Sequence, residues 1–139
     1  MSTLAKESGI GWTTFSVDDA SGTPRDIRTD VGSLQFATPR AVQDVTGIDK
    51  SAIERLLLLA DFSITVTGPA FDDATASSHA VFKTVPSTSI PRTTSIAVSG
   101  QTLANEVLYT DYQLNRGQDG SLGYTAPGVL ADGVVPTWS

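Results

Sequence analysis

The segment DFSITVTG, residues 61–68, contains the clearest secondary-structure signal in the sequence. Phe62, Ile64 and Val66 alternate with polar residues, and this period of two is typical of a strand that buries one face. The Ile, Val and Thr side chains in the segment also favour extended backbone because they are branched at Cβ. The segment therefore predicts a strand in a sheet with one apolar face.

The composition extends this prediction to the rest of the chain. The 139 residues include 33 Ser and Thr and 12 Val, which favour strands and turns over long helices. Hydrophobic residues make up 40% of the chain and charged residues 17%, so a buried core is expected. The length fits one domain over residues 1–139. We therefore expect a single, mainly β unit.

The charge and the residue inventory argue against several functional classes. A net charge of −6 disfavours a surface that grips nucleic acid phosphates or anionic lipid. The absence of cysteine excludes thiolate catalysis and Cys-ligated zinc. No apolar stretch reaches the length of a membrane span, and the first thirty residues lack a signal-peptide pattern. We expect a protein made in the cytoplasm with no membrane partner.

Turn residues and apolar spacing divide the chain on both sides of residues 61–68. The expected strands cover residues 12–18, 93–99, 101–116 and 120–125, the last three as a meander. The residues with helical spacing are Ser78, Val81, Phe82 and Val85. Because Asp72 or Asp73 can cap a helix start and Pro86 blocks continuation, one flanking helix is expected over about residues 73–85.

The segment 51–60 gives a local helical signal. Ser51 and Glu54 match a capping box, and the apolar residues after them are spaced as in a helix. The run Leu56–Leu59 is typical of a core or an interface, because four residues cannot span a bilayer. A short helical turn is predicted here.

The sequence shows no constellation typical of an enzyme or a metal site. His79 is the only histidine, and we expect it at the surface or at a boundary rather than in catalysis. Three acidic groups lack calcium-loop spacing and are expected to serve in turns and caps; they are Asp18 with Asp19, Asp26 with Asp30, and Asp72 with Asp73. No catalytic, cofactor or metal residue is assigned, and no enzymatic activity is expected.

Four longer segments carry a family resemblance. They are DVTGIDKSAIERLLLLADFSITVTG at 44–68, SHAVFKTV at 78–85, GQTLANEVLYTDY at 100–112 and DGSLGYTAPGVLADG at 119–133. In order and spacing, over about residues 12–138, the chain resembles tail tube proteins (major tail proteins) of long-tailed, siphovirus-type phages, especially those of actinobacteria. None of these motifs is catalytic, so the resemblance rests on its extent.

The resemblance implies a β-sandwich or barrel-like tail tube fold with one flanking helix, and a loop or short turn near Ser51–Leu57. It implies six subunits in a ring, whose inner sheets join into one β-barrel around a lumen, and rings stacked into a tube. Double-stranded DNA would pass through the tube without specific binding. The implied partners are other copies of the chain, a tape-measure protein, a tail terminator and a distal tail protein. The implied location is the virion tail, after synthesis in the host bacterium.

Alternation and terminal composition single out candidate positions for such an assembly. Towards the end of segment 101–116 the odd-numbered face turns polar, and polar residues alternate with apolar ones near residue 34 as well. This face lines the lumen or covers the outside of a tube. The candidate lumen residues are Asp111, Gln113, Asn115, Ser33 and Gln35. The candidate interface comprises Leu57, Leu58 and Trp138, with a flexible N-terminal arm over 1–11 and an extended C-terminal arm over 126–139.

Two other functional classes stay open at this stage. One is a different phage structural β-module, such as a capsid decoration or a baseplate domain. The other is a β-sandwich that binds calcium or carbohydrate. Electron microscopy separates the first from a tube, and chelator-sensitive melting or glycan binding would identify the second.

Overall fold

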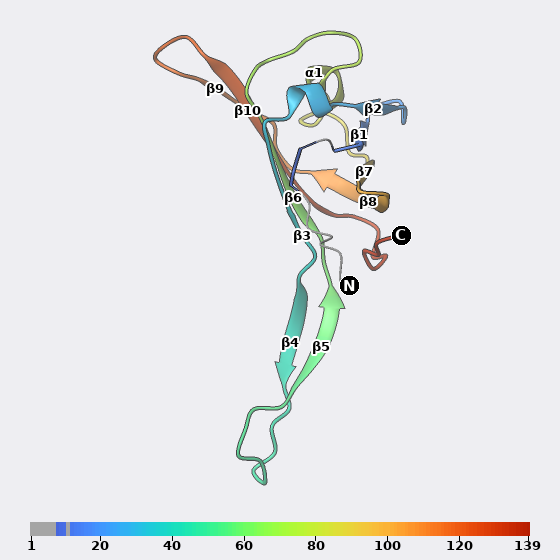
Figure 1. Ribbon diagram of the computed structural model, residues 1–139, viewed down its shortest axis with the longest axis vertical. Coiled ribbons are helices and arrows are strands. Elements are labelled where there is room, and N and C mark those ends of the chain that lie inside the picture. The colour runs from blue at the N-terminus through green and yellow to red at the C-terminus, as the bar shows by residue number, and fades with distance from the viewer. Residues whose placement is uncertain (1–7, 11) are drawn as a thin grey trace, which may run out of the picture.

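The computed structural model describes residues 8–10 and 12–139, and it is mainly β with antiparallel strands, as expected from the sequence (Figure 1). Residues 1–7 and 11 of the predicted arm over residues 1–11 therefore lie outside the described residues. The strands are β1 (Thr14–Asp18), β2 (Pro24–Asp26), β3 (Ser33–Ala37), β4 (Arg40–Asp44), β5 (Arg55–Ala60), β6 (Ser63–Gly68), β7 (Arg92–Val98), β8 (Gln101–Tyr109), β9 (Gln113–Arg116) and β10 (Leu122–Leu130). The helices are the 3-10 turn η1 (Arg28–Asp30) and α1 (Ser78–Phe82).

One large sheet has the strand order β2-β1-β7-β8-β10-β6-β3, and β9 also pairs with β10. Strands β8 and β9 follow each other along one side of β10, because Val107–Tyr109 pair with Gly128–Leu130 and Gln113–Arg116 pair with Leu122–Thr125. The short β8–β10 ladder divides the sheet into two halves. Strands β9, β10, β6 and β3 form one half, and strands β8, β7, β1 and β2 form the other.

A single core joins the two halves and continues beneath α1. Phe15 and Ile96 from one half, Ile64 and Tyr124 from the other, and Phe82 from α1 are all buried in one apolar cluster. The ring centroid of Phe82 lies 6.0 Å from that of Tyr124. This packing gives the sandwich-like arrangement expected for the fold. No helix in the described ranges is long and apolar enough to cross a membrane.

The helix α1 is much shorter than the predicted helix over about 73–85. The Asp72 carboxylate accepts a hydrogen bond from Ala74 N at 3.0 Å, and the Ser77 hydroxyl donates to the carbonyls of Asp72 and Ala74. These local bonds hold the segment before α1 in turns, because short polar side chains compete with helical backbone bonding. The Asp30 carboxylate instead caps the helix, accepting from Ser78 N at 3.0 Å.

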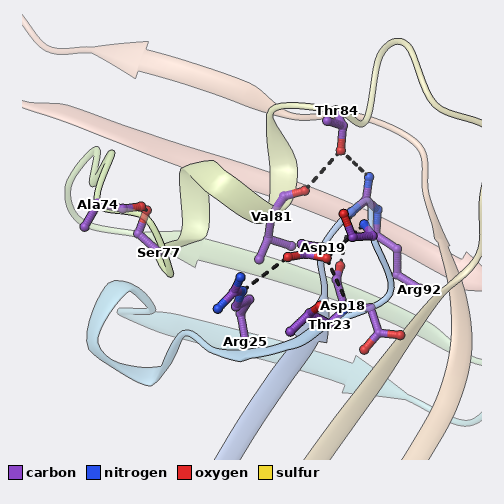
Figure 2. A network of polar contacts seen from close by, with 10 residues as sticks. Asp18, Asp19, Thr23, Arg25, Ala74, Ser77, Val81, Thr84 and Arg92 are labelled. Atoms are coloured by element: carbon purple, nitrogen blue, oxygen red, sulfur yellow. Dashed lines mark hydrogen bonds and ion pairs between the residues drawn. The ribbon is translucent and has the colours of Figure 1, made fainter.

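Arg92 connects three segments at the end of the sandwich near α1 (Figure 2). Its side chain is buried, and its guanidinium donates to the Asp18 carbonyl at 3.1 Å and to the Thr84 hydroxyl at 2.6 Å. Beside it, the Asp19 carboxylate accepts from Thr23 N at 3.0 Å and pairs with Arg25 at 3.2 Å. These bonds lower the pKa of Asp19, the bond from Thr23 N contributing most. In the acidic pair at residues 18–19, the Asp19 carboxylate therefore shapes a turn, whereas Asp18 contributes its backbone carbonyl.

Strands β4 and β5 form a separate hairpin that extends away from the sheet (Figure 1). The predicted helical turn near residues 51–57 is wrong, because β5 begins at Arg55 and its Leu57 stands opposite Val42. Glu54 makes no capping box; its N–H donates to the Thr46 hydroxyl at 2.7 Å. The partner strand supplies the hydrogen bonds that a helix would make internally.

Two further boundaries differ from the sequence expectation. The predicted strand over 101–116 breaks at residues 110–112, between β8 and β9. The predicted arm over 126–139 begins later, because β10 continues to Leu130 with Ala126 buried. Pro127 is accommodated in this inner strand because it lies opposite the break, where Thr110 N donates to the Pro127 carbonyl at 3.1 Å and the missing proline N–H is not needed.

Candidate assembly surface

The half-sheet of β9, β10, β6 and β3 brings four of the five candidate lumen residues to one face, all except Asp111. The pairs Ser33–Thr67, Thr67–Thr125 and Thr125–Gln113 lie directly opposite each other across successive strands. Opposite residues in an antiparallel ladder point to the same side of the sheet. Ser33 and Gln113 therefore share the face turned away from the core, as do Gln35 and Asn115 two residues along their strands.

This surface, named here the polar face, has no charged residue among its members on the four strands. They are Ser33, Gln35, Ala37, Ser63, Thr65, Thr67, Gln113, Asn115, Gly123, Thr125, Pro127 and Val129. Thr65, Thr67 and Thr125 are members beyond the candidate lumen residues, and the alternation in segment 61–68 already indicates that the first two are turned away from the core. The polar face is thus wider than the candidates and is rich in hydroxyl groups.

Asp111 lies beside the polar face and not in a strand. It occupies the bend between β8 and β9, where its carboxylate accepts from Tyr112 N and from Gln113 Nε2, each at 2.8 Å. The side chain is exposed at the margin of the half-sheet. Its negative charge therefore stands at the rim of the polar face.

The half-sheet ends in two edges that no described strand covers. Strand β3 pairs only with β6, and strand β9 pairs only with β10. Each edge presents unpaired backbone N–H and C=O groups, which are templates for pairing with another chain. The polar face is therefore bounded on both sides by edges suited to strand addition.

The β4–β5 hairpin exposes leucines on both of its sides. Leu57 is 60% exposed opposite Val42, and Leu56 is exposed opposite Gln43, so alternation turns them to opposite sides of the ribbon. Leu58 is 41% exposed, and its carbonyl accepts two hydrogen bonds from the Arg40 guanidinium, at 3.1 and 2.8 Å. The hairpin is thus ordered by its own ladder while its apolar side chains stay uncovered, which is typical of a contact surface.

Trp138 packs against the sandwich of its own chain and does not lie in a free extended arm. Ser139 and Thr102 exchange two backbone hydrogen bonds of 2.8 Å, which places Trp138 beside Leu103 of β8. The indole ring lies 6.2 Å from the Phe36 ring, yet the residue stays 44% exposed. One part of Trp138 therefore packs within the subunit and the other part is free for a neighbour.

Asp30, Asp72 and His79 are engaged in structural contacts. Burial and the nearby Asp72 carboxylate raise the pKa of Asp30, whereas the bond from Ala74 N, together with Asp30, lowers the pKa of Asp72. His79 Nδ1 lies 3.1 Å from the Tyr112 hydroxyl, and its ring lies 4.5 Å from the Phe71 ring. Across residues 8–10 and 12–139, no group of three or more His, Cys, Asp or Glu is arranged to hold a metal ion.

Comparisons with known proteins identify the fold. No protein-family profile and no curated protein sequence matches the chain. A chain from the tail of an empty gene transfer agent particle, solved with C6 symmetry, superposes with a TM-score of 0.69 at 17% identity, covering 96% of this chain and 98% of that one. A chain from the virion of a native gene transfer agent particle gives a TM-score of 0.67 at 13% identity, covering 95% and 99%. Over nearly its whole length, this chain therefore has the fold of chains from the tail and the virion of gene transfer agent particles.

Proposed function

We propose that this chain is the repeating subunit of a phage-type tail tube, in which six copies form a ring and the rings stack. One observation carries the proposal: an uncharged face of four strands is bounded by two open edges. The shared fold with a chain from a tail of C6 symmetry supports it. So does the resemblance to siphovirus-type tail tube proteins over about residues 12–138. The role is structural and requires no enzymatic chemistry.

The directions of the strands suit ring closure. Strand β3 is antiparallel to β6, β6 to β10, and β10 to β9, so β9 runs antiparallel to β3. When β9 of one copy adds to β3 of the next, the antiparallel ladder continues without interruption. Such head-to-tail contacts close into a ring at a fixed copy number. Six copies of four strands make a 24-stranded barrel, about 115 Å around and about 37 Å across before strand tilt widens it.

The position of the core decides which face meets the lumen of such a ring. The second half-sheet and α1 cover the side of the four strands opposite the polar face. A closed barrel with this bulk inside would be filled, so the bulk lies outside and the polar face lines the lumen. Because the polar face carries no Lys or Arg, the lumen offers DNA phosphates no ion pairs, and the duplex slides during ejection.

The leucine-bearing hairpin then reaches a neighbouring subunit. Burying a leucine side chain contributes about 1.5–3 kcal/mol, so covering even two of the four at Leu56–Leu59 contributes several kcal/mol per contact. A two-stranded hairpin is only marginally stable alone, so contact with a neighbouring subunit would stabilise it. In the virion tail, further partners would be the tape-measure protein, a tail terminator and a distal tail protein.

Electron microscopy of the purified chain at high concentration, with two-dimensional averaging, tests the proposal. Sixfold rings or tubes are expected. Monomers or trimers at every concentration, also with a tape-measure protein present, would instead fit a capsid decoration or baseplate module. Melting that depends on calcium, or binding to a glycan array, would favour a binding domain.

A further inference from the structure

A cavity of about 530 Å³ opens at the free edge of β3. Its apolar wall consists of Trp12, Phe15, Val31 and Leu34, with Arg28 among the polar lining residues. Phe15 is fully buried at the bottom of the core, whereas Leu34 is only partly covered. Among residues 8–10 and 12–139, no side chain fills this apolar surface at the edge where a neighbouring strand would be added.

The opposite edge of the half-sheet carries a side chain of matching chemistry. Leu114 of β9 stands opposite the buried Tyr124, so it points to the core side of the sheet and not to the polar face. It is 46% exposed because no described strand lies beyond β9. An apolar side chain at one edge and an apolar cavity at the other are therefore on the same side of the sheet.

We propose that Leu114 of one subunit occupies the cavity of the next, directly opposite Leu34 in an antiparallel β3–β9 ladder. This inference rests on the proposed ring and assigns its register. With Leu34 opposite Leu114, Gln35 faces Gln113 and Ser33 faces Asn115 on the lumen side. The polar face then continues from subunit to subunit through amide and hydroxyl pairs.

The neighbouring registers are less favourable. A shift by one residue would set core-side residues of β9 opposite polar-face residues of β3, which a continuous sheet does not allow because β10 and β6 already fix the faces of the two strands. A shift by two residues in one direction would place Arg116 opposite Leu34, and its guanidinium would lose water against the apolar wall. A shift by two in the other direction would place Tyr112 opposite Leu34, although its ring already packs against Phe82 and Tyr124 of its own subunit. In the proposed register Arg116 instead stands opposite Gly32, which has no side chain to crowd it.

The chain is well suited to a direct test because it contains no cysteine. Within one subunit β6 and β10 separate β3 from β9, a distance of about 14 Å across three strand spacings. A disulfide needs Cα atoms about 4.4–6.8 Å apart, so paired cysteines on these two strands can bond only between subunits. The double variant Gln35→Cys with Gln113→Cys reports the proposed register. The double variant Gln35→Cys with Asn115→Cys, which uses the same strands, reports the shifted register in which Arg116 is opposite Leu34.

Both variants would be assembled under reducing conditions, imaged as rings, oxidised and run on a non-reducing denaturing gel. We expect a ladder of covalent oligomers up to six for the first variant and essentially monomer for the second. A ladder only in the second variant would overturn the register and the placement of Leu114. Rings that form with no ladder in either would overturn the proposed register and the placement of Leu114 while leaving the tube function intact. Failure of the unmodified chain to form rings would overturn both.

A pair of truncations tests the filling of the cavity. Leu122 is on the same core-side face as Leu114, opposite Arg116, and is 37% exposed, but it lies on β10, away from the edge. We expect Leu114→Ala to raise the concentration needed for assembly roughly tenfold and Leu122→Ala by less than about threefold, because only Leu114 gains burial between subunits. Melting of the dilute subunit should change equally little in both. Equal assembly defects would show that Leu114 has no special contact.

Discussion

Asp30 caps the only α-helix of the described chain from a distant segment: its carboxylate accepts the Ser78 N–H at 3.0 Å, 48 residues along the sequence. The Tyr124 hydroxyl donates to the carbonyl of the same residue at 2.8 Å. Asp30 thus ties η1, α1 and β10 together at the end of the sandwich. Because its side chain is buried close to Asp72, its ionisation affects the stability of the fold.

This contact predicts a specific pH dependence. The raised pKa of Asp30 means that the folded state favours the protonated carboxyl. The contribution of Asp30 to the free energy of unfolding is therefore fully present below its unfolded pKa of about 3.9. It is lost as the pH rises through the pKa of the folded state. Asp30→Asn keeps an oxygen for Ser78 N but cannot ionise. We therefore expect the difference in melting temperature, Asp30→Asn minus the unmodified chain, to increase as the pH rises from 4 to 7.

Asp119 supplies a control of opposite sign. The hydrogen bond from Ser121 N at 3.0 Å is the main cause that lowers the pKa of Asp119. The contribution of Asp119 to the free energy of unfolding is therefore present above its unfolded pKa and is lost as the pH falls through the pKa of the folded state. The melting temperature of Asp119→Asn relative to the unmodified chain should fall as pH rises. Identical pH profiles for the two variants would contradict the assignment for Asp30.

The hairpin leucines should matter more for assembly than for folding. Leu57 is 60% exposed and Leu58 is 41% exposed, so Leu57→Asp should change the free energy of unfolding by about 0.5 kcal/mol and Leu58→Asp by about 1 kcal/mol. Assembly should be abolished in sedimentation, because a charge cannot be buried unpaired at a subunit contact. Ser87→Asp, at an exposed position in the loop between α1 and β7, serves as the control. Normal tubes from Leu57→Asp would remove the hairpin from the interface.

A positive charge on the polar face should impair passage of DNA. Gln113→Lys would place six ammonium groups per ring in the proposed lumen, and each can pair with a phosphate. We expect intact tubes, salt-sensitive DNA binding and reduced infectivity in a phage complementation assay. Gln118→Lys, in the exposed turn after β9, should have none of these effects. Normal infectivity of the Gln113→Lys variant, together with chemical labelling of the introduced amine from outside intact tubes, would place the polar face on the exterior.

Trp138 should contribute to two different contacts. Its ring packs on Phe36 within the subunit but keeps 44% of its surface exposed, so Trp138→Ala should destabilise the isolated chain by about 1–2 kcal/mol. If a neighbouring subunit covers the exposed part of Trp138, the variant needs a higher protein concentration for assembly than the loss of subunit stability alone explains. Deleting only residues 137–139 would additionally remove the backbone bonds to Thr102. Melting and assembly defects of equal size would assign Trp138 entirely to its own subunit.

A local sequence pattern predicts the structure correctly where the contacts of the folded chain favour the same structure. The alternation of Phe62, Ile64 and Val66 predicts a shared buried face, and all three are buried at or next to β6. Turn chemistry predicts reversals at Gly100 and Gly120, and both have positive φ, a conformation that glycine adopts without a steric penalty. These features can be predicted from the sequence because alternation and turn chemistry act over a few residues.

Long-range contacts set the features on which the proposed site depends. The helical spacing at Leu56–Leu59 is overruled because β4 offers that segment a partner strand. Leu108 and Gln113 have opposite parity in the sequence, yet both share a face with β10 residues Val129 and Thr125, because the bend at 110–112 reverses the alternation. The polar face, the two open edges and the cavity beside Leu34 arise from pairings between residues far apart in the chain. Loop closure and long-range pairing produce these features, and neither is encoded in the period of a single segment.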